Sequence, residues 1–258
     1  MTAYTSMLST QELLLVREAG FRPLTQVMGS CFYHVGWQGI PYAGSMWGQG
    51  QTFELETQTE AWNEARRLAL ERLAGEAQRA DADAVVGVRL ERGTYDWAAG
   101  TIEFVATGTA VASERYELGP QPVLSNLSGQ EFAKLYRHGY WPAGLVAGTT
   151  ACFVATGWRQ RQMTSILGGA WQNQELPDFT QGLYDARAQA MRRLERQAHE
   201  LGASGVVGVA IERAEHEVEV NDVTCLIVTM HVLGTAIVEL AAPQEQPPVY
   251  VALPLEEP

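Results

Sequence analysis

The chain has 258 residues, and its 46% hydrophobic and 19% charged residues are the proportions of a folded globular protein, which excludes a disordered chain. A formal net charge of −12, from 18 Lys and Arg against 30 Asp and Glu, excludes the broad basic surface that binds nucleic acid. The sequence shows no secretion signal, no apolar run long enough to span a membrane and only three scattered cysteines, so we expect a cytoplasmic protein without disulfides or membrane insertion.

An internal repeat dominates the sequence and predicts its domain organisation. Matched blocks lie 119, then 121, then 126 residues apart, so the second copy gains residues between the blocks and not inside them. The blocks are Leu8–Glu12 with Leu127–Glu131, Cys31–Phe32 with Cys152–Phe153, Val85–Val88 with Val206–Val209, and Gly108–Val111 with Gly234–Ile237. We therefore predict a first module at 1–119, a second module at 120–240 and a Pro-rich tail at 241–258.

Each module is predicted to open with a short helix. The pattern Ser-x-x-Glu, at Ser9 and again at Ser128, forms a capping box in which two side chains satisfy free N–H groups at the start of a helix. Glycine accepts the left-handed conformation that ends a helix, so Gly20 and Gly139 mark the two ends.

An extended segment follows each helix, because residues 23–35 and 142–156 are rich in Val, Thr, Phe and Tyr. The glycine inside each segment, Gly29 or Gly148, predicts a bulge or a bend. A Gly- and Trp-rich connection comes next, and it either folds back on its module or forms a subunit interface or ligand site. Its candidate interface or ligand residues are Trp37, Tyr42, Trp47, Trp158 and Trp171.

The clearest element of each module is an amphipathic helix, because apolar residues recur at helical spacing. The apolar faces consist of Trp62, Ala65, Ala69, Leu70, Leu73 and Ala77 in the first copy, and of Leu183, Ala186, Ala190, Met191, Leu194 and Ala198 in the second. The opposite faces carry charged side chains, among them Arg66 and Arg187. These faces are predicted to be solvated or to contact another subunit.

Two strands complete each module. The β-branched runs at 85–88 and 206–209 predict a buried strand. The last strand, 222–238 in the second copy, is apolar on both faces, so we expect its sheet to be covered by its own helix and by a neighbouring module or subunit. The inserted segment before it, which contains His216–Glu219, is predicted to be an acidic surface loop.

These residues resemble the YbjQ-like family, which is also labelled "putative heavy-metal-binding". The resemblance covers most of the chain outside the linker and the tail, and it consists of structural glycines and strand residues. It is carried by Phe21–Pro23, Val27–Ser30, Ala82–Val88, Gly108–Val111, Val146–Thr149, Leu201–Val209 and Gly234–Ile237.

The resemblance implies an α+β fold of two tandem dodecin-subunit-like β-α-β-β modules with antiparallel-rich sheets, each preceded here by its capped helix. It also implies self-association into a homopentamer or a related ring, and it implies no known reaction. Because two copies are fused, the chain is expected to form either two stacked rings or one larger closed ring.

The family label suggests a metal ion, for which Cys31, His34 and Cys152 are the candidate ligands. Cys31 and His34 have a Cys-x-x-His spacing, but the second copy has no histidine after Cys152, and a closed zinc site needs four ligands. Copies of these residues around a ring are one way to complete a site. Because one chain supplies too few ligands, we expect no cofactor. A metal-handling protein is the alternative function.

No catalytic motif is present in the sequence: it lacks a nucleophile elbow, a phosphate-binding loop, a zinc-protease helix and a dinucleotide fingerprint. We therefore expect a non-enzymatic, ring-forming scaffold or binding module of the cytoplasm. An enzyme whose site is shared between subunits ranks third, after the metal-handling protein.

Overall fold

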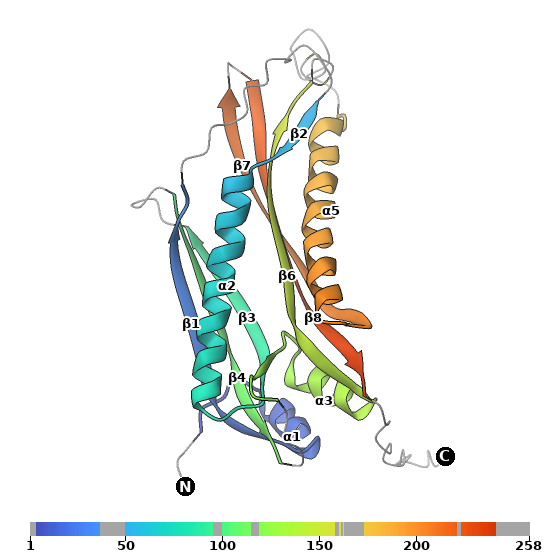
Figure 1. Ribbon diagram of the computed structural model, residues 1–258. Helices are drawn as coiled ribbons and strands as arrows, with labels where there is room; N and C mark the ends of the chain where they lie inside the picture. Colours follow the sequence, from blue (N-terminus) through green and yellow to red (C-terminus); the bar gives the residue numbers. More distant parts are fainter. Residues whose placement is uncertain are drawn as a thin grey trace, which may run out of the picture.

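The computed structural model describes residues 4–36, 50–94, 100–114, 119–157, 160, 162, 173–220 and 223–240. These residues form four helices and two four-stranded sheets that are mostly antiparallel, which confirms the α+β class. The layers follow one another in the order first sheet, helix α2, second sheet, helix α5, so that α2 lies between the two sheets (Figure 1).

The elements of the first copy are α1 (Thr10–Glu18), β1 (Phe21–His34), β2 (Gln51–Glu54), α2 (Glu56–Arg79), β3 (Ala84–Thr94) and β4 (Thr101–Ser113). Those of the second copy are β5 (Val123–Leu124), α3 (Gly129–Arg137), β6 (Tyr140–Ala155), α5 (Pro177–Glu200), β7 (Gly205–Val220) and β8 (Val223–Glu239). The first sheet has the order β1-β4-β3-β5 and the second β2-β6-β8-β7.

The two copies exchange strands, which the sequence did not predict. Strand β2 precedes the long helix of the first copy, but it pairs antiparallel with β6 at the edge of the second sheet. Strand β5 precedes α3 of the second copy, but it pairs parallel with β3 of the first sheet. Each sheet therefore contains one strand from the other copy.

The predicted capped helices are confirmed. Ser9 and Ser128 are the N-caps of α1 and α3, and each forms a complete capping box with the glutamate three residues later. The glycines that follow these helices, Gly20 and Gly139, have φ angles of 89° and 81°, a region that side chains disfavour. The local signals of the sequence therefore place both helix ends correctly.

Gly29 and Gly148 allow the long helices to lie directly on their sheets. A Cβ atom at Gly29 would lie 2.1 Å from the carbonyl oxygen of Ala69 in α2, and one at Gly148 would lie 2.2 Å from that of Ala190 in α5. The bulge or bend predicted at these glycines is wrong, because the registers shift earlier, at 23–25 and 142–144. Both glycines are required by helix packing instead.

The strand registers correct one part of the predicted repeat. Gly29 pairs with Ala106, and Gly148 pairs with Val232, so β1 and β6 superpose at a displacement of 119 along their whole paired length. The structural counterpart of Cys31 is therefore Thr150 and not Cys152. A shift of two residues keeps every side chain on the same face of a strand, so similarity of sequence did not separate the two registers.

Strand β7 continues to Val220 and pairs with β8 along its full length. The predicted acidic loop at His216–Glu219 is therefore wrong, and the alternation of valine with charged residues there is that of a strand. Among the described residues, no helix is both long and apolar enough to cross a membrane.

Three buried clusters form most of the core. The first lies between α2 and the first sheet, and the second lies between α5 and the second sheet. The third is shared by both copies, because it joins Phe21 of β1 to Phe132 and Tyr136 of α3. The second sheet is covered by α5 on one face and approached by α2 on the other, as predicted from the two apolar faces of its last strand.

Candidate functional site

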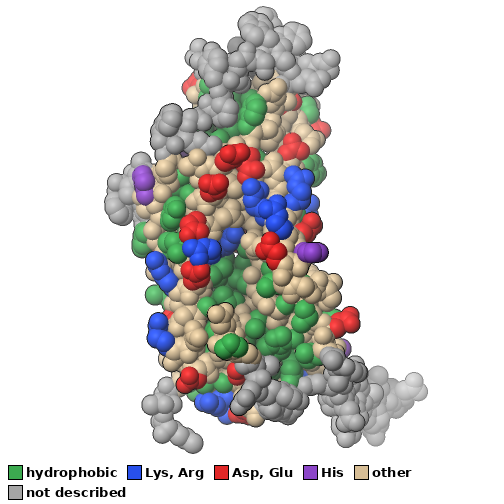
Figure 2. Space-filling view, in the orientation of Figure 1, with side chains coloured by type: hydrophobic (Ala, Val, Ile, Leu, Met, Phe, Trp, Pro, Cys, Tyr) green, Lys and Arg blue, Asp and Glu red, His purple; other side chains and the backbone are tan. Residues whose placement is uncertain are grey.

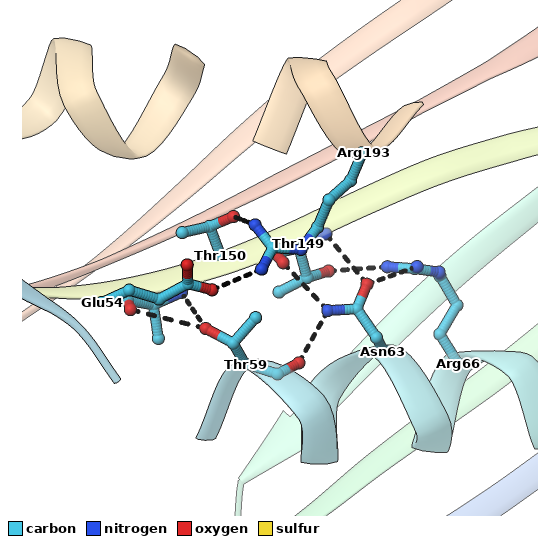
Figure 3. Close-up of polar contacts among 8 residues, drawn as sticks. Glu54, Thr59, Asn63, Arg66, Thr149, Thr150 and Arg193 are labelled. Atoms are coloured by element: carbon cyan, nitrogen blue, oxygen red, sulfur yellow. Dashed lines mark hydrogen bonds and ion pairs between the residues drawn. The ribbon is translucent and has the colours of Figure 1, made fainter. Parts of the chain in front are cut away.

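The contact between α2 of the first copy and β6 of the second, which we call the joint, holds a polar network (Figure 3). Thr59, Asn63 and Arg66 follow one another along α2 at spacings of three and four residues, so they share one face of that helix. An adjacent face, with Ala65 and Ala69, packs on the first sheet. One helix thus presents an apolar face to its own sheet and a polar face to the other copy.

Side chains of α2 satisfy the backbone edge of β6 beyond the end of β2. The amide of Asn63 donates to the carbonyl of Thr149 at 2.9 Å and accepts from its N–H at 3.1 Å. The hydroxyl of Thr59 accepts from the N–H of Ala151 at 2.9 Å. Because β2 pairs only with 152–155, these side chains replace the missing part of that strand.

Arg66 is the charged centre of the joint. Its guanidinium donates to the Thr149 hydroxyl at 2.6 Å, to Asn63 Oδ1 at 2.7 Å and to the Ala147 carbonyl at 3.4 Å. The residue is only 6% exposed, so the predicted solvated face is wrong at this position. Burial lowers the pKa of Arg66 to about 10, which leaves it charged at neutral pH, and no described carboxylate forms an ion pair with it.

A second connection crosses the joint at its upper end in Figure 3. Arg193 of α5 forms an ion pair with Glu54 of the exchanged strand β2 and donates to the Thr150 hydroxyl at 2.9 Å. Glu54 comes from the first copy, whereas Arg193 and Thr150 come from the second. The pair therefore fixes β2 against the helix of the other copy.

His231 of β8 extends the network, since its Nδ1 lies 3.0 Å from the Thr149 hydroxyl. Arg66 can only donate, so the Thr149 oxygen accepts from Arg66; among the described residues Nδ1 of His231 is then the acceptor within reach of the hydroxyl proton, and the hydroxyl is assigned as its donor. The imidazole is then neutral with its proton on Nε2. Burial, followed by the charges of Arg92 and Arg66, lowers the pKa of His231 to about 2, in agreement with the neutral form.

Two hollows adjoin the joint. A cavity of about 340 Å³ is lined by Arg66, Thr149 and His231 together with residues of β3 and β7. A larger open groove of about 1130 Å³ follows the outer side of α2 toward the end of α5. Charged side chains of both signs gather across the middle of the face that Figure 2 shows.

The structure does not bring the candidate metal ligands together. Cys31 is buried beneath α2 and Cys152 beneath α5, in separate core clusters, whereas His34 is exposed. Burial, with the nearby carboxylates of Glu54 and Asp185, raises the pKa of Cys152 to about 12 and disfavours the thiolate that binds metals. The described part of the chain contains no group of three or more His, Cys, Asp or Glu side chains suited to a metal ion.

The aromatic candidates Trp37, Tyr42, Trp47, Trp158 and Trp171 all lie outside the described residues. Sequence reasoning missed the joint, although a signal for it exists. The repeat is defined by positions at which the copies agree, whereas two of the joint residues differ: Asn63 corresponds to Tyr184 and His231 to Val105. Differences between copies mark the surfaces that only one copy buries.

Comparison with known proteins agrees with this duplicated architecture. The family model described as "Putative heavy-metal-binding" matches residues 50–114 and 143–239, one stretch in each copy. The chain is 38% identical over 215 residues to the encapsulin nanocompartment protein Rv1762c of Mycobacterium tuberculosis, covering 80% of this chain and 77% of that protein.

Shorter relatives match only part of the chain. A UPF0145 protein of Methanococcus maripaludis is 50% identical over 58 residues, which are 22% of this chain and 50% of that protein. A UPF0145 protein of Thermotoga petrophila is 44% identical over 62 residues, which are 24% of this chain and 57% of that protein. With matches in both of its copies, the chain belongs to the YbjQ family of UPF0145 proteins.

Proposed function

We propose that this chain is a non-enzymatic scaffold or binding module of the cytoplasm that assembles head to tail into a closed ring. The observation that carries the proposal is a difference in burial between the copies. Residues that are buried at the joint have structural counterparts that are exposed, on β1 of the first copy and on α5 of the second. Each chain therefore presents both halves of a second, chain-to-chain joint.

The outer face of β1 is one of these halves. Ala147 and Ala151 of β6 are 3% and 0% exposed at the joint, whereas their counterparts Met28 and Phe32 in β1 are 55% and 58% exposed. Met28 corresponds to Ala147 because their N–H groups donate to Glu76 and Gln197, which occupy the same position in α2 and α5. In β6 this face lies against α2, whereas in β1 no described helix covers it.

The outer face of α5 is the other half. Its Tyr184 is 61% exposed where α2 has Asn63, and Arg187 is exposed where α2 has the buried Arg66. Residues 173–175 immediately before α5 correspond to the exchanged strand β2, yet they lie outside the described strands. We expect this segment to pair with the end of β1 of a neighbouring chain, as β2 pairs with β6 within one chain.

The sheet edges lead to the same arrangement. Strands β1 and β7 are outer edges of the two sheets, and long open edges are avoided in native proteins. Tyr4 and Thr5 correspond to the two residues of β5, so they suit the β7 edge of a preceding chain. Because the two contacting surfaces differ, the association is heterologous, and it ends only by closing into a ring such as a pentamer.

A cysteine pair tests this joint directly. Ser30 and Tyr184 are the counterparts of Thr149 and Asn63, which are in contact, so the variant Ser30→Cys/Tyr184→Cys is expected to form disulfides between chains. Denaturing gels should show a ladder that ends at the ring size, and native mass spectrometry of the unmodified chain should give the same number of subunits.

The single variants serve as controls, and each should give no ladder beyond a dimer. The matched pair Asn63→Cys/Thr149→Cys should link within one chain and leave its mass unchanged. A mass of 28.3 kDa for the unmodified chain at micromolar concentration would contradict the ring. A ring without the Ser30–Tyr184 ladder would contradict the proposed chain-to-chain joint.

The relationship to an encapsulin nanocompartment protein suggests where such a ring acts. We extend the proposal to an association between this chain and an encapsulin shell. Co-expression with an encapsulin shell protein should leave the chain in purified intact shells after washing at high salt. An unrelated globular protein of similar mass is the control, and equal amounts of both proteins in the shells would contradict a specific association.

A further inference from the structure

We infer that the cavity at the joint, lined by Arg66, Thr149 and His231, is a binding site for a small oxyanion, either a phosphate or a carboxylate. The joint lies within one chain, so this inference is independent of ring assembly. It rests on an uncompensated buried cation, on a buried N–H group that lacks an acceptor among the described residues, and on the size and charge of the cavity.

Arg66 is a buried cation with neutral partners only. Its three hydrogen bonds to described residues go to a hydroxyl, an amide oxygen and a backbone carbonyl, and they use three of the five N–H groups of a guanidinium. A buried charge that lacks a counterion is unfavourable, and the two remaining N–H groups of the guanidinium, one on Nε and one on Nη1, are donors for an anion.

His231 supplies a further donor in the lining of the same cavity. The neutral form of His231 carries its proton on Nε2, and this buried nitrogen has no acceptor among the described residues. Buried N–H groups are almost always paired in native proteins, so this exception in the lining of the cavity indicates an absent acceptor.

The charge and size of the cavity favour an anion. Its lining includes Arg66, Arg89 and Arg92 against Glu91 and Glu212, which leaves one positive charge in excess although the chain as a whole carries −12. Arg92 is already paired with Glu212. A volume of about 340 Å³ is at the lower end of the range for small-molecule sites and far exceeds that of one water molecule.

The site is specific to the joint within the chain. The structural counterparts of His231 and Thr149 are Val105 and Ser30, and the counterpart of Arg66 is the exposed Arg187. The chain-to-chain joint therefore lacks the imidazole. One anion per chain is therefore expected. The valine at the counterpart position also indicates a substitution for His231 that adds no polar group.

Isothermal titration of the full chain with sodium phosphate and with sodium citrate, at an ionic strength held constant with sodium chloride, tests the inference. At least one anion should bind saturably with one site per chain, and the two titrations distinguish a phosphate from a carboxylate ligand. Arg66→Gln should raise the Kd at least tenfold, because it removes the charged donor. Arg67→Gln, at an exposed position on the same helix that does not line the cavity, is the matched control and should leave the Kd unchanged.

His231→Val is a second variant for the case in which Arg66→Gln does not fold, as judged by circular dichroism. It should weaken binding severalfold. The inference is overturned if neither anion binds saturably to the unmodified chain, or if the folded Arg66 and His231 variants bind with the affinity of the Arg67 control.

Discussion

Phe132→Ala is expected to lower the free energy of unfolding by about 3–5 kcal/mol. Phe132 is 0% exposed, and its ring centroid lies 5.1 Å from that of Phe21 and 5.8 Å from that of Trp141. This cluster joins the copies, so the cavity left by the substitution weakens both at once. The midpoint of urea denaturation, followed by circular dichroism at one protein concentration, measures the loss.

Leu13→Ala is the matched control, because Leu13 occupies the position of Phe132 in α1, 119 residues earlier. Leu13 is only half-buried, so its loss should cost less than half as much. Equal losses for the two variants would show that the shared cluster makes no special contribution to stability.

Gly148→Ala is expected to cost about 3 kcal/mol, although it adds a single methyl group. The new Cβ would lie 2.2 Å from the carbonyl oxygen of Ala190, which is backbone and cannot rotate away. Helix α5 has to move off the second sheet, and the core between them loses contact. Thermal unfolding should show a lower midpoint, and the near-ultraviolet spectrum should lose intensity.

Gly75→Ala provides the opposite case on the other long helix. Nothing lies within 4 Å of a Cβ at Gly75, and alanine is favoured over glycine inside a helix, so this variant should gain roughly 0.5–1 kcal/mol. If Gly75→Ala and Gly148→Ala changed the free energy of unfolding in the same direction, the close approach of α5 to β6 would not be the cause of the loss at Gly148.

The elements that depend on neighbouring residues could be predicted from the sequence. The capping boxes at Ser9 and Ser128 and the apolar faces of the two long helices are local patterns, and the structure confirms them. The duplication was visible because structural glycines and strand residues recur. These features need no knowledge of what the second copy packs against.

The joint could not be predicted in the same way. Strands β2 and β5 are four and two residues long, too short for a periodic pattern, and their partners belong to the other copy. Arg66 has the same chemistry as Arg187, yet the first is buried and the second exposed, because Arg66 lies against β6 of the other copy. Burial here depends on what lies next to the copy and not on its own sequence.

The strand exchange also determines when the molecule can finish folding. Residues 51–54 acquire their partner only after 152–155 have been synthesised, roughly 100 residues later, which at about 5–20 residues per second takes some seconds or more. Until then the nascent first copy has no partner for β2 and none for the polar face of α2. Its native contacts are completed only after β6 of the second copy has left the ribosome.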